Sequence, residues 1–541
     1  MCGGMERGDG PVYDLVIIGG GINGTGIARD AAGRGLSVVL VEMGDLAGAT
    51  SSASSKLIHG GLRSLEHRQF RLVREALAER EVLLHTAPHL VRPLMFYMPH
   101  VPAVRPAWTI RAGLFLYDHL ARRSKLPCSQ SLDLAHHQAG AVLTAAARGF
   151  AYADCYGDDA RLVLANAMDA ARLGAVILTR TRCSALTPGG PDGDRGPPVW
   201  AVTVTDGLTG CLRRLWGRVV INTAGPWARA VHDLAAAPAT PTPEMCLVKG
   251  SHIVVPRLYE GEHAYILQND DRRVVFVIPY EGSFSLIGTT DIPYHGDPST
   301  VTAAAAEIDY LCAALNRYFR VPLTRERVLW SYAGVRPLFD DGAQDPSQIR
   351  RDHVLIHQGN WKEGTPVLVS VFGGTITTYR RLAEAVLARL ADVFPSLKPP
   401  WTAQAVLPGG DLGPEGLEGW LKESHGRWPW VSHTLLRRYG RSYGSRTALV
   451  IGDGTAPFRS WIRLRWWLAR SRGGIPHHAR IRPFGRRYLV APQQTWPAFV
   501  CDGTRCPGER PGASWFDAGA VGTGADALHA RRLRAGCAAR P

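Results

Sequence analysis

Long apolar runs are missing from the sequence. None is long enough to cross a membrane, and the residues before position 12 carry no apolar core of the kind that a secretion signal needs. The sequence therefore predicts a protein that stays in the cytoplasm. Hydrophobic residues make up 45% and charged residues 20% of the 541 residues, which is typical of a globular protein too long for a single core.

Paired cysteines are missing as well. The 10 cysteines are scattered, with no C-x-x-C pair and no cluster of histidine and cysteine at ligand spacing. This pattern predicts reduced, mostly buried thiols and no metal site.

Positive charge is unevenly distributed. Residues 455–541 contain 15 arginines, no lysine and 4 acidic residues, and so carry +11 of the total formal charge of +15. The rest of the chain is nearly neutral. A basic nucleic-acid-binding tail is one interpretation, but no nucleic-acid-binding motif accompanies the charge, so we expect no specific nucleic-acid partner.

Residues 13–42 read as one complete βαβ unit. A continuous apolar run at 15–18 predicts a strand buried on both faces, a helix with small apolar residues on one side follows, and residues 37–41 predict a second strand. Between the first strand and the helix, Gly19, Gly21 and Gly24 stand in the G-x-G-x-x-G spacing. An ordinary glycine-rich turn can show that spacing alone, but strand, helix and second strand in register indicate dinucleotide binding.

Each position of this unit has a physical purpose. Gly19 permits the tight turn, Gly21 lets a pyrophosphate approach the backbone, and Gly24 lets helix and strand pack closely. The phosphates are expected on the N–H groups at the helix N-terminus, beside Ile22 and Asn23. Glu42, 18 positions after Gly24, ends the second strand, where a carboxylate can accept hydrogen bonds from both ribose hydroxyls.

A serine-rich segment follows the unit. For a nicotinamide enzyme it has no obvious purpose, whereas for a flavin enzyme its hydroxyl and N–H groups would cover the cofactor. The candidate cofactor contacts in this segment are Thr50, Ser51, Ser52, Ser55, Lys56, Leu57, Gly60 and Gly61.

Two later strands also end in small residues. The first leads to Ala224 and Gly225, where backbone can pass close to a cofactor. The second, at 368–374, closes on Gly373 and Gly374, and we expect a helix over 375–390. That helix N-terminus suits the electron-rich end of a flavin. Alternating apolar residues at 251–256, 272–280 and 283–291 predict antiparallel strands of a substrate sheet.

Several long motifs in order resemble the FAD-dependent glycerol-3-phosphate dehydrogenases, the quinone-reducing enzymes of glycerol catabolism. The resemblance begins with GGGINGTGIARDAAGRGLSVVLVE and TSSASSKLIHGGLR and continues through FRLVREALAEREV, RPAWTIRAGLFLYDHL and YADCYGDDARLVLANA. It resumes at INTAGPWA, KGSHIVVPR, IGTTD, SYAGVRPL and LPGGD. About three-quarters of the chain is covered.

The resemblance implies oxidation of sn-glycerol 3-phosphate to dihydroxyacetone phosphate, with hydride transferred to FAD and electrons passed to a quinone. It also implies peripheral contact with the inner face of the cell membrane, and it leaves a homodimer open. Two rival functions remain: an FAD-dependent amine or hydroxy-acid oxidase, and a flavin-binding protein without catalysis.

The implied reaction needs cations for a phosphate dianion and a base for the hydroxyl proton. Arg63 and Arg336 are the phosphate candidates because guanidinium forks match phosphate geometry, and Arg380 is a third cation that a solvated helix position would also explain. His59 and His252 compete for the role of base, each against the alternative of a structural histidine.

Position 375 departs from the family pattern. The family motif reads FGGK, whereas this chain reads FGGT, with Thr375 at the expected opening of the helix. Threonine can cap a helix, but a full positive charge near substrate and flavin is missing. Losing one preorganised charge-assisted donor costs on the order of 3 kcal/mol, roughly a hundredfold in rate. The sequence therefore predicts weak or altered turnover.

The predicted fold is an α/β fold of the glutathione-reductase-like type. An FAD-binding domain is expected from residues 1–80, 151–230 and 341–400, with a substrate or cap segment at 81–150 and a substrate domain at 231–340. A C-terminal helical domain is expected at 401–455 and an aberrant basic tail at 456–541.

Two further segments carry hypotheses. Residues 105–123 combine Trp108, Leu114, Phe115, Leu116 and Tyr117 with flanking arginines, as an interfacial helix would, although a core helix explains them equally well. After Ala456 the sequence loses helical periodicity, and its codons can be chosen so that the neighbouring frame spells a helix-like peptide. We therefore suspect a frameshift near this residue, which reading the coding DNA in the adjacent frame would test.

Overall fold

The computed structural model describes residues 10–101, 105–122, 126–144, 148–190, 198–235, 244–271, 273–339 and 352–452. The chain forms two compact units, residues 1–492 and 493–541, and every described residue belongs to the first. The basic tail, the suspected frameshift at Ala456 and the side chain of Arg63 lie outside the described part.

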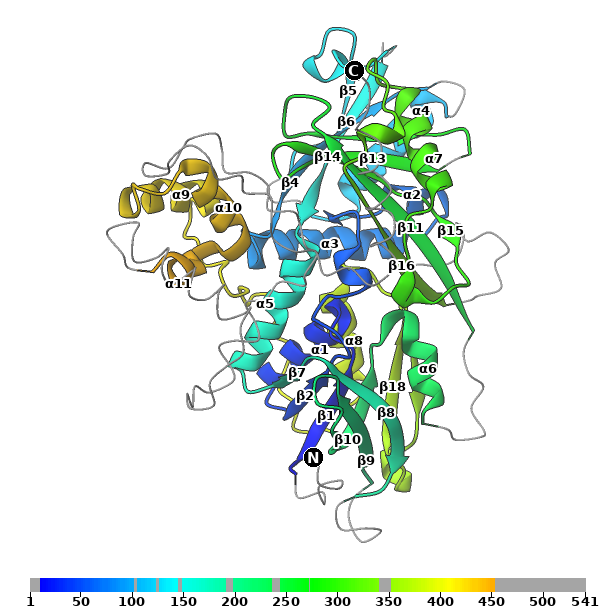
Figure 1. Cartoon of the computed structure of the whole chain (residues 1–541), viewed down its shortest axis with the longest axis vertical. Helices are drawn as coiled ribbons and strands as arrows, with labels where there is room; N and C mark the ends of the chain where they lie inside the picture. The colour runs from blue at the N-terminus through cyan, green and yellow to red at the C-terminus, as the bar shows by residue number, and fades with distance from the viewer. Residues whose placement is uncertain are drawn as a thin grey trace, which may run out of the picture. The chain divides into compact units, whose positions relative to one another are not determined.

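The first of two sheets contains the βαβ unit that the sequence predicts (Figure 1). Its path runs β17-β18-β10-β1-β2-β7. All neighbours along it are parallel except β17 and β18. A hairpin of β8 and β9 pairs with β10. The strands are β1 (Val12–Ile18), β2 (Val38–Val41), β7 (Val176–Leu178), β8 (Thr181–Pro188), β9 (Trp200–Asp206), β10 (Leu212–Asn222), β17 (Val354–Gln358) and β18 (Val367–Phe372).

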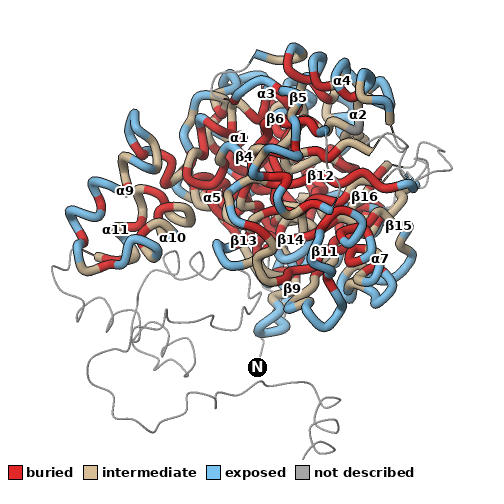
Figure 2. Tube along the Cα trace, turned by 90° about the horizontal axis from the view of Figure 1, so that it is seen from above, coloured by how far each residue is buried: buried red, intermediate tan, exposed pale blue. Residues whose placement is uncertain are grey.

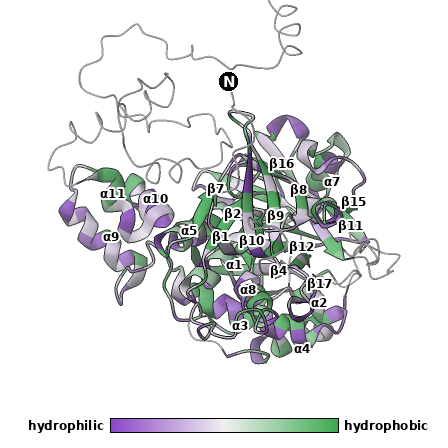
Figure 3. Cartoon of the chain, turned by 90° about the horizontal axis from the view of Figure 1, so that it is seen from below, coloured by the Kyte–Doolittle hydropathy of each residue, from purple (hydrophilic) through white to green (hydrophobic). Residues whose placement is uncertain are grey.

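Both faces of this sheet are covered, which explains the continuous apolar strands. Leu15 and Ile17 pack with α1 (Ile22–Gly33), α5 (Asp159–Arg172) and α8 (Tyr379–Ala388). Val16 and Ile18, which alternate with them, pack on the opposite side with β9 and with α6 (Ala228–Asp233). Figure 2 shows that buried residues fill the interior of this part of the chain, and Figure 3 shows hydrophobic residues along β2 of this sheet.

The second sheet is mostly antiparallel and follows the order β15-β11-β14-β13-β12-β4-β6-β3, with β16 paired to β11 and β5 to β6. The antiparallel strands predicted at 251–256, 272–280 and 283–291 are confirmed: they correspond to segments of β11, β13 and β14. The strands are β3 (Leu57–Ile58), β4 (Val91–Pro99), β5 (Gln130–Asp133), β6 (Arg148–Gly157), β11 (Met245–Pro256), β12 (Ala264–Gln268), β13 (Val274–Tyr280), β14 (Phe284–Gly288), β15 (Ile292–Pro293) and β16 (Trp330–Phe339).

Further helices accompany the second sheet and form the C-terminal end of the described chain. Helix α7 (Ala305–Asn316) packs Leu311 and Leu315 against Ile253, Val275 and Ile287 of the sheet. The other helices in this part are α2 (Leu62–Glu66), α3 (Phe70–Thr86) and α4 (Ala107–His119). The expected helical segments near the C-terminus are α9 (Gly416–Arg427), α10 (His433–Tyr443) and α11 (Thr447–Ile451), with glycines at positions 444 and 452 directly after α10 and α11.

Helix α4 combines the two interpretations of residues 105–123. Its Leu114 and Tyr117 are fully buried, as in a core helix, whereas Trp108 is 74% and Phe115 57% exposed. Leu116 is also exposed. No helix in the described part of the chain is both long enough and apolar enough to span a bilayer.

The predicted helix at 375–390 begins later than expected. Gly373 and Gly374 have φ values of 79° and 90°, and a turn at 375–378 separates them from α8, which starts at Tyr379. Thr375 therefore does not open the helix. Its Oγ1 instead accepts a hydrogen bond from the Thr378 main-chain N–H at 3.3 Å within that turn.

Candidate active site

The carboxyl ends of β1, β2, β10 and β18 lie at one edge of the first sheet, because these strands are parallel. Ligands of open α/β sheets bind at this edge, where the order of strands reverses. Here the reversal falls at β1, since the chain proceeds from β1 to β2 on one side and later returns to β10 and β18 on the other.

The glycine loop at this edge has no room for side chains. A Cβ at position 24 would collide with the main-chain oxygen of Gly19, and a Cβ at position 19 would collide with that of Thr223. Gly19 also has a φ of 114°, which favours glycine. Ser51 lies beside the loop, where its Oγ accepts a hydrogen bond from the Ile22 N–H, the first N–H group of α1, at 3.0 Å. N–H groups at a helix start and a nearby hydroxyl suit a diphosphate.

Glu42 follows β2 at the same edge. Its carboxylate accepts hydrogen bonds from the N–H groups of Gly20 at 2.6 Å and Gly44 at 2.7 Å. Burial raises the pKa of the Glu42 carboxyl, and these two bonds oppose the rise. A carboxylate has about four lone-pair sites, so acceptor capacity for ribose hydroxyls remains.

The two glycine turns of the first sheet touch each other. Asn23 in α1 donates from Nδ2 to the main-chain oxygen of Gly373 at 3.3 Å, although 350 residues separate the two. The Oδ1 atom of Asn23 is buried and has no hydrogen-bond partner in the described part of the chain. On the other side, Ala224 and Gly225 directly follow Thr223, whose Oγ1 donates to the main-chain oxygen of Ile18 at 3.0 Å. An unsatisfied acceptor between turns too tight for side chains fits a bound cofactor with hydrogen-bond donors.

The predicted cofactor segment at 50–57 also bridges to other elements. Thr50 donates to the main-chain oxygen of Val335 in β16 at 2.7 Å, and Ser55 contacts His252 at 2.8 Å. The amine of Lys56 pairs with Asp159 at 2.7 Å and also donates to the main-chain oxygen of Ser52 at 3.3 Å. Leu57 begins β3. Lys56 therefore fixes the segment to α5 rather than offering a free cation.

A pocket opens at the second sheet, next to the loop that follows β3. Its wall includes His59 and Gly61 from the loop, Gln268 and Phe276 from β12 and β13, and Thr289. Leu62, Ser64, Asp291 and Arg105 also contribute. The wall thus combines an imidazole, hydroxyl groups, an amide and a guanidinium with apolar side chains, which suits a small polar ligand.

Arg336 is attached to this wall. Its Nη1 forms an ion pair with Asp291, and its Nη2 contacts the Thr289 hydroxyl at 3.5 Å. The side chain is 28% exposed, and the carboxylate of Asp291 holds the guanidinium in one orientation. Of the three arginines that the sequence singles out, Arg336 is placed beside the pocket.

The two candidate histidines occupy different environments. His59 lines the pocket, and its main-chain N–H donates to Thr377 Oγ1 at 3.3 Å. His252 is only 1% exposed, is stacked on Tyr332 and is hydrogen-bonded through Nε2 to Ser55 at 2.8 Å. Burial, with smaller contributions from Arg336 and Lys56, lowers the pKa of His252 to about 3, so its ring is neutral at neutral pH.

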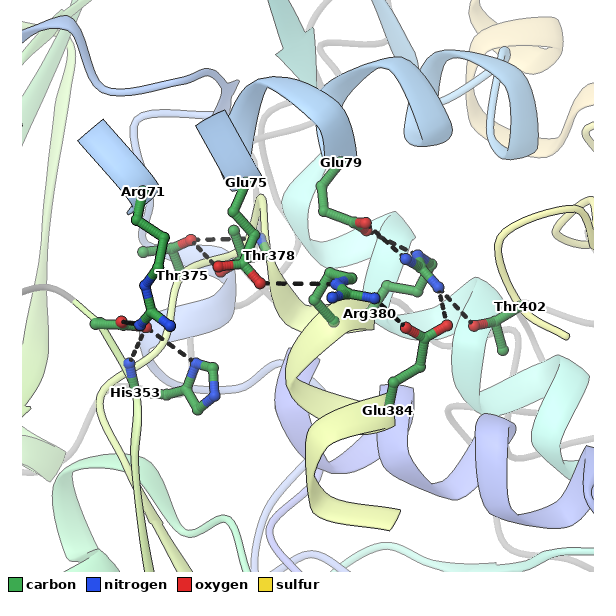
Figure 4. Close-up of polar contacts among 11 residues, drawn as sticks. Arg71, Glu75, Glu79, His353, Thr375, Thr378, Arg380, Glu384 and Thr402 are labelled. Atoms are coloured by element: carbon green, nitrogen blue, oxygen red, sulfur yellow. Dashed lines mark hydrogen bonds and ion pairs between the residues drawn. The ribbon is translucent and has the colours of Figure 1, made fainter. Parts of the chain in front are cut away.

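Arg380 lies in a buried ion-pair cluster instead of the pocket wall (Figure 4). Its guanidinium donates to both carboxylate oxygens of Glu79 in α3, at 2.7 and 2.6 Å, and also pairs with Glu384. The side chain is 7% exposed, so it is neither solvated nor directed at solvent. Figure 4 shows Thr375 and Thr378 near this cluster.

Several residues of the pocket are not singled out by the sequence analysis. Arg105 is a second guanidinium in the wall, where it forms an ion pair with Glu66 at 2.7 Å. Gln268 is 4% exposed, and its Oε1 atom has no hydrogen-bond partner among the described residues. Polar residues inside the apolar runs of IGTTD and AYILQN were the available signal, since a polar side chain in a buried strand needs a partner.

No group of three or more His, Cys, Asp and Glu side chains that could hold a metal ion occurs within the described ranges. Among the described residues, the thiols of Cys128, Cys155, Cys183 and Cys312 are free.

Comparisons with known proteins agree with this geometry. The family model of FAD dependent oxidoreductases matches residues 14–380. The chain is 51% identical over 437 residues to a glycerol-3-phosphate dehydrogenase of Pseudomonas aeruginosa, covering 80% of this chain and 82% of that protein. It is 49% identical over 481 residues to a D-erythritol 1-phosphate dehydrogenase of Brucella abortus, covering 88% and 91%.

A solved structure is similar as well. The glycerol-3-phosphate dehydrogenase of Bacillus halodurans, complexed with FAD, superposes with a TM-score of 0.63 at 28% identity, covering 82% of this chain and 78% of that one. The glutathione-reductase-like fold class and the FAD cofactor predicted from the sequence are confirmed. The chain belongs to the family of FAD-dependent oxidoreductases that includes the glycerol-3-phosphate dehydrogenases.

Proposed function

We propose that the protein oxidises sn-glycerol 3-phosphate to dihydroxyacetone phosphate. The observation that carries this proposal is the position of Arg336, whose guanidinium is bonded to Thr289 and Asp291 of a pocket that His59 also lines. A phosphate dianion needs a fixed guanidinium, and a hydroxyl that loses a hydride needs a proton acceptor. The similarity to glycerol-3-phosphate dehydrogenases supports the same reaction.

The residues of the first sheet are proposed to hold FAD. The N–H groups at the start of α1, with Ser51, would take the diphosphate, and Glu42 would accept from the ribose hydroxyls. Bound there, FAD supplies the acceptor for the hydride. We further propose that the first sheet with its helices is the FAD-binding domain and the second sheet the substrate domain.

For the proton acceptor, the geometry favours His59 over His252. His59 lines the pocket, whereas His252 is absent from its wall and buried behind the Ser55 hydroxyl. We expect His59→Asn to lower kcat by a factor of about 100 or more, in the range of a lost general base. His252→Asn is expected to have a smaller effect on kcat, and the opposite order would assign the base to His252.

The decisive experiment is anaerobic bleaching of the flavin. The purified protein should be yellow, and sn-glycerol 3-phosphate added without oxygen should remove the flavin absorbance near neutral pH. A yellow protein that does not bleach would indicate a flavin carrier without catalysis. Bleaching by an amino acid alone would indicate an oxidase.

We propose that the electrons then pass to a quinone at the inner face of the cell membrane, with α4 making the membrane contact. Trp108 and Phe115 are seven positions apart, two helical turns, and both are largely exposed. The double variant Trp108→Ser, Phe115→Ser should bind anionic lipid vesicles at least about tenfold less tightly. Leu208→Ser is the control, since Leu208 is 71% exposed in the turn after β9. Equal loss in both would refute α4 as the contact.

A second substrate deserves a direct comparison: D-erythritol 1-phosphate, which adds one carbon and one hydroxyl. The similarity to the Brucella abortus enzyme favours it, as does the buried Oε1 atom of Gln268 at the pocket, which has no partner in the described part of the chain. An extra hydroxyl would donate to that atom.

Measuring kcat/KM for both substrates decides between them. If D-erythritol 1-phosphate is preferred, Gln268→Leu should lower kcat/KM for this substrate about tenfold, since one lost hydrogen bond costs about 1.4 kcal/mol. The kcat/KM for glycerol 3-phosphate should change little. Equal losses for both substrates would show that Gln268 does not read the extra hydroxyl.

A further inference from the structure

The loop at 59–61 between β3 and α2 is held from two sides. The main-chain N–H of His59 donates to Thr377 Oγ1 at 3.3 Å, and the next N–H, that of Gly60, donates to the hydroxyl of Tyr117 at 2.8 Å. Thr377 precedes α8 and Tyr117 lies in α4, so the anchors come from different parts of the chain. Consecutive N–H groups fixed by distant side chains leave the loop little freedom.

The Tyr117 hydroxyl has a defined direction. It lies 2.8 and 2.9 Å from the two carboxylate oxygens of Asp154 in β6, and Asp154 is paired with Arg80 of α3 at 2.6 Å. An ionised carboxylate only accepts hydrogen bonds, so the single proton of Tyr117 points at Asp154. A lone pair of the same oxygen is then left to accept from Gly60.

This arrangement is closed to water. Tyr117 and Arg80 are 0% exposed and Asp154 is 2% exposed. Burial, together with the nearby Asp154 charge, raises the pKa of Tyr117 well above its usual value, so the phenol keeps its proton at all working pH values. The hydroxyl therefore acts as a permanent acceptor for the Gly60 N–H.

Position 60 is fitted to this hydroxyl. A Cβ on Gly60 would lie 2.8 Å from the Tyr117 oxygen and 2.6 Å from Cδ2 of Leu77. The main chain thus approaches Tyr117 as closely as only glycine allows. Any movement of Tyr117 would be passed to Gly60 and to the neighbouring residue in the pocket wall, His59.

We propose that Tyr117 is a positioning residue for this reaction: with Asp154 and Arg80 it fixes Gly60 and thereby the place of His59 in the pocket. Tyr117 itself does not belong to the pocket wall, so it acts through the loop and not on the substrate. The inference rests on the proposed function, in which His59 receives the substrate proton.

The kinetic test uses Tyr117→Phe in the full-length flavoprotein. Removing the acceptor should lower kcat about tenfold or more, since small misplacements of a reacting group are costly, and leave KM nearly unchanged. The control is Tyr265→Phe. Tyr265 is also 0% exposed and donates to the main-chain oxygen of Ala139 at 2.6 Å. It should lose stability similarly without a change in kcat.

A double variant separates positioning from general weakening. If Tyr117 acts through His59, Tyr117→Phe combined with His59→Asn should be no slower than His59→Asn alone. Losses that multiply would overturn the inference, because Tyr117 would then act independently of His59.

Hydrogen exchange of the loop tests the same inference without any turnover. In Tyr117→Phe, the amides of the peptide spanning residues 57–66 should exchange about tenfold faster, since a buried N–H loses its acceptor. In Tyr265→Phe they should not. Unchanged exchange in Tyr117→Phe would overturn the inference. Faster exchange in a protein whose flavin is not bleached by glycerol 3-phosphate would contradict the proposed function and leave the anchoring of the loop by Tyr117 intact.

Discussion

The candidate ligand sites of the two sheets are built by different means. At the edge of the first sheet, main-chain atoms in tight turns form the surface, and side chains such as Glu42 are themselves fixed by backbone N–H groups. At the second sheet, the pocket is lined by side chains from several strands and loops, and ion pairs such as Arg336 with Asp291 set their orientation. A backbone site tolerates almost no substitution, whereas a side-chain site can be retuned residue by residue.

The largest expected effect is at the backbone site. Gly24→Val should yield a colourless protein, because even a Cβ at this position collides with the Gly19 main-chain oxygen. The ratio of flavin to protein absorbance after purification measures it. Gly426→Ala in α9 is the control, since nothing lies within 4 Å of the added Cβ. Full flavin content in Gly24→Val would contradict the view that the site at the first sheet is formed by main-chain atoms that leave no room for a side chain.

The next largest effect is expected for Arg336 and Arg380, both of which the sequence offers as phosphate-binding cations. Arg336→Met should raise KM about a hundredfold with little change in melting temperature, because in the proposed function the lost contact is to the substrate phosphate. Arg380→Met should instead destabilise the fold by about 3 kcal/mol or more, since it leaves Glu79 and Glu384 buried without their partner. Measuring KM and the melting temperature of both variants tests whether Arg336 acts at the pocket and Arg380 in the fold.

The substitution Thr375→Lys tests whether a positive charge at position 375, directly after the glycine turn that follows β18, affects turnover. Adding the positive charge that the family motif carries should raise kcat, by up to about a hundredfold. Within the described part of the chain, the hydroxyl it removes bonds to Thr378 in the local turn. Thr375→Met, of similar length but uncharged, should not raise the rate. Equal rates in the wild type and Thr375→Lys would refute the role assigned to position 375.

The smallest expected effect is on how the stability of the fold depends on pH, through His252 in the second sheet. Because burial depresses the pKa of His252 to about 3, the folded state resists protonation there, while the unfolded chain takes up a proton near pH 6.5. Stability from this residue is present above pH 6.5 and is lost as the pH falls toward 3, by about 1.4 kcal/mol for each unit. Denaturant unfolding at pH 7.5 and 5 should show a smaller difference for His252→Phe than for the wild type. An equal difference would contradict the buried, neutral state.

The sequence predicts the main-chain site at the first sheet better than the side-chain pocket at the second. The turn at Gly19 to Gly24 was predictable because its constraints are local: a strand, a helix and a glycine spacing within 30 residues. Antiparallel strands such as β11 and β14 were predictable from their alternating residues. Both are patterns that one segment carries by itself.

The roles of charged side chains were not predictable in this way. Arg336 and Arg380 look alike in sequence, and only the fold brings Asp291 to one and Glu79, 301 residues away, to the other. Likewise Arg105 and Gln268 reach the pocket from separate elements. The late start of α8 depends on positive φ values at two successive glycines, which the sequence permits but does not require.

The hydrogen bond between Asn23 and Gly373 has a consequence for biosynthesis. Because its two partners are 350 residues apart, a nascent chain exposes the first glycine turn long before the second has been translated. Strand β18 must pair with β10 before Gly373 can contact Asn23, and pairing between such distant segments is slow. We therefore expect the complete flavin site to form only after the segment around Gly373 has been translated and has joined the sheet.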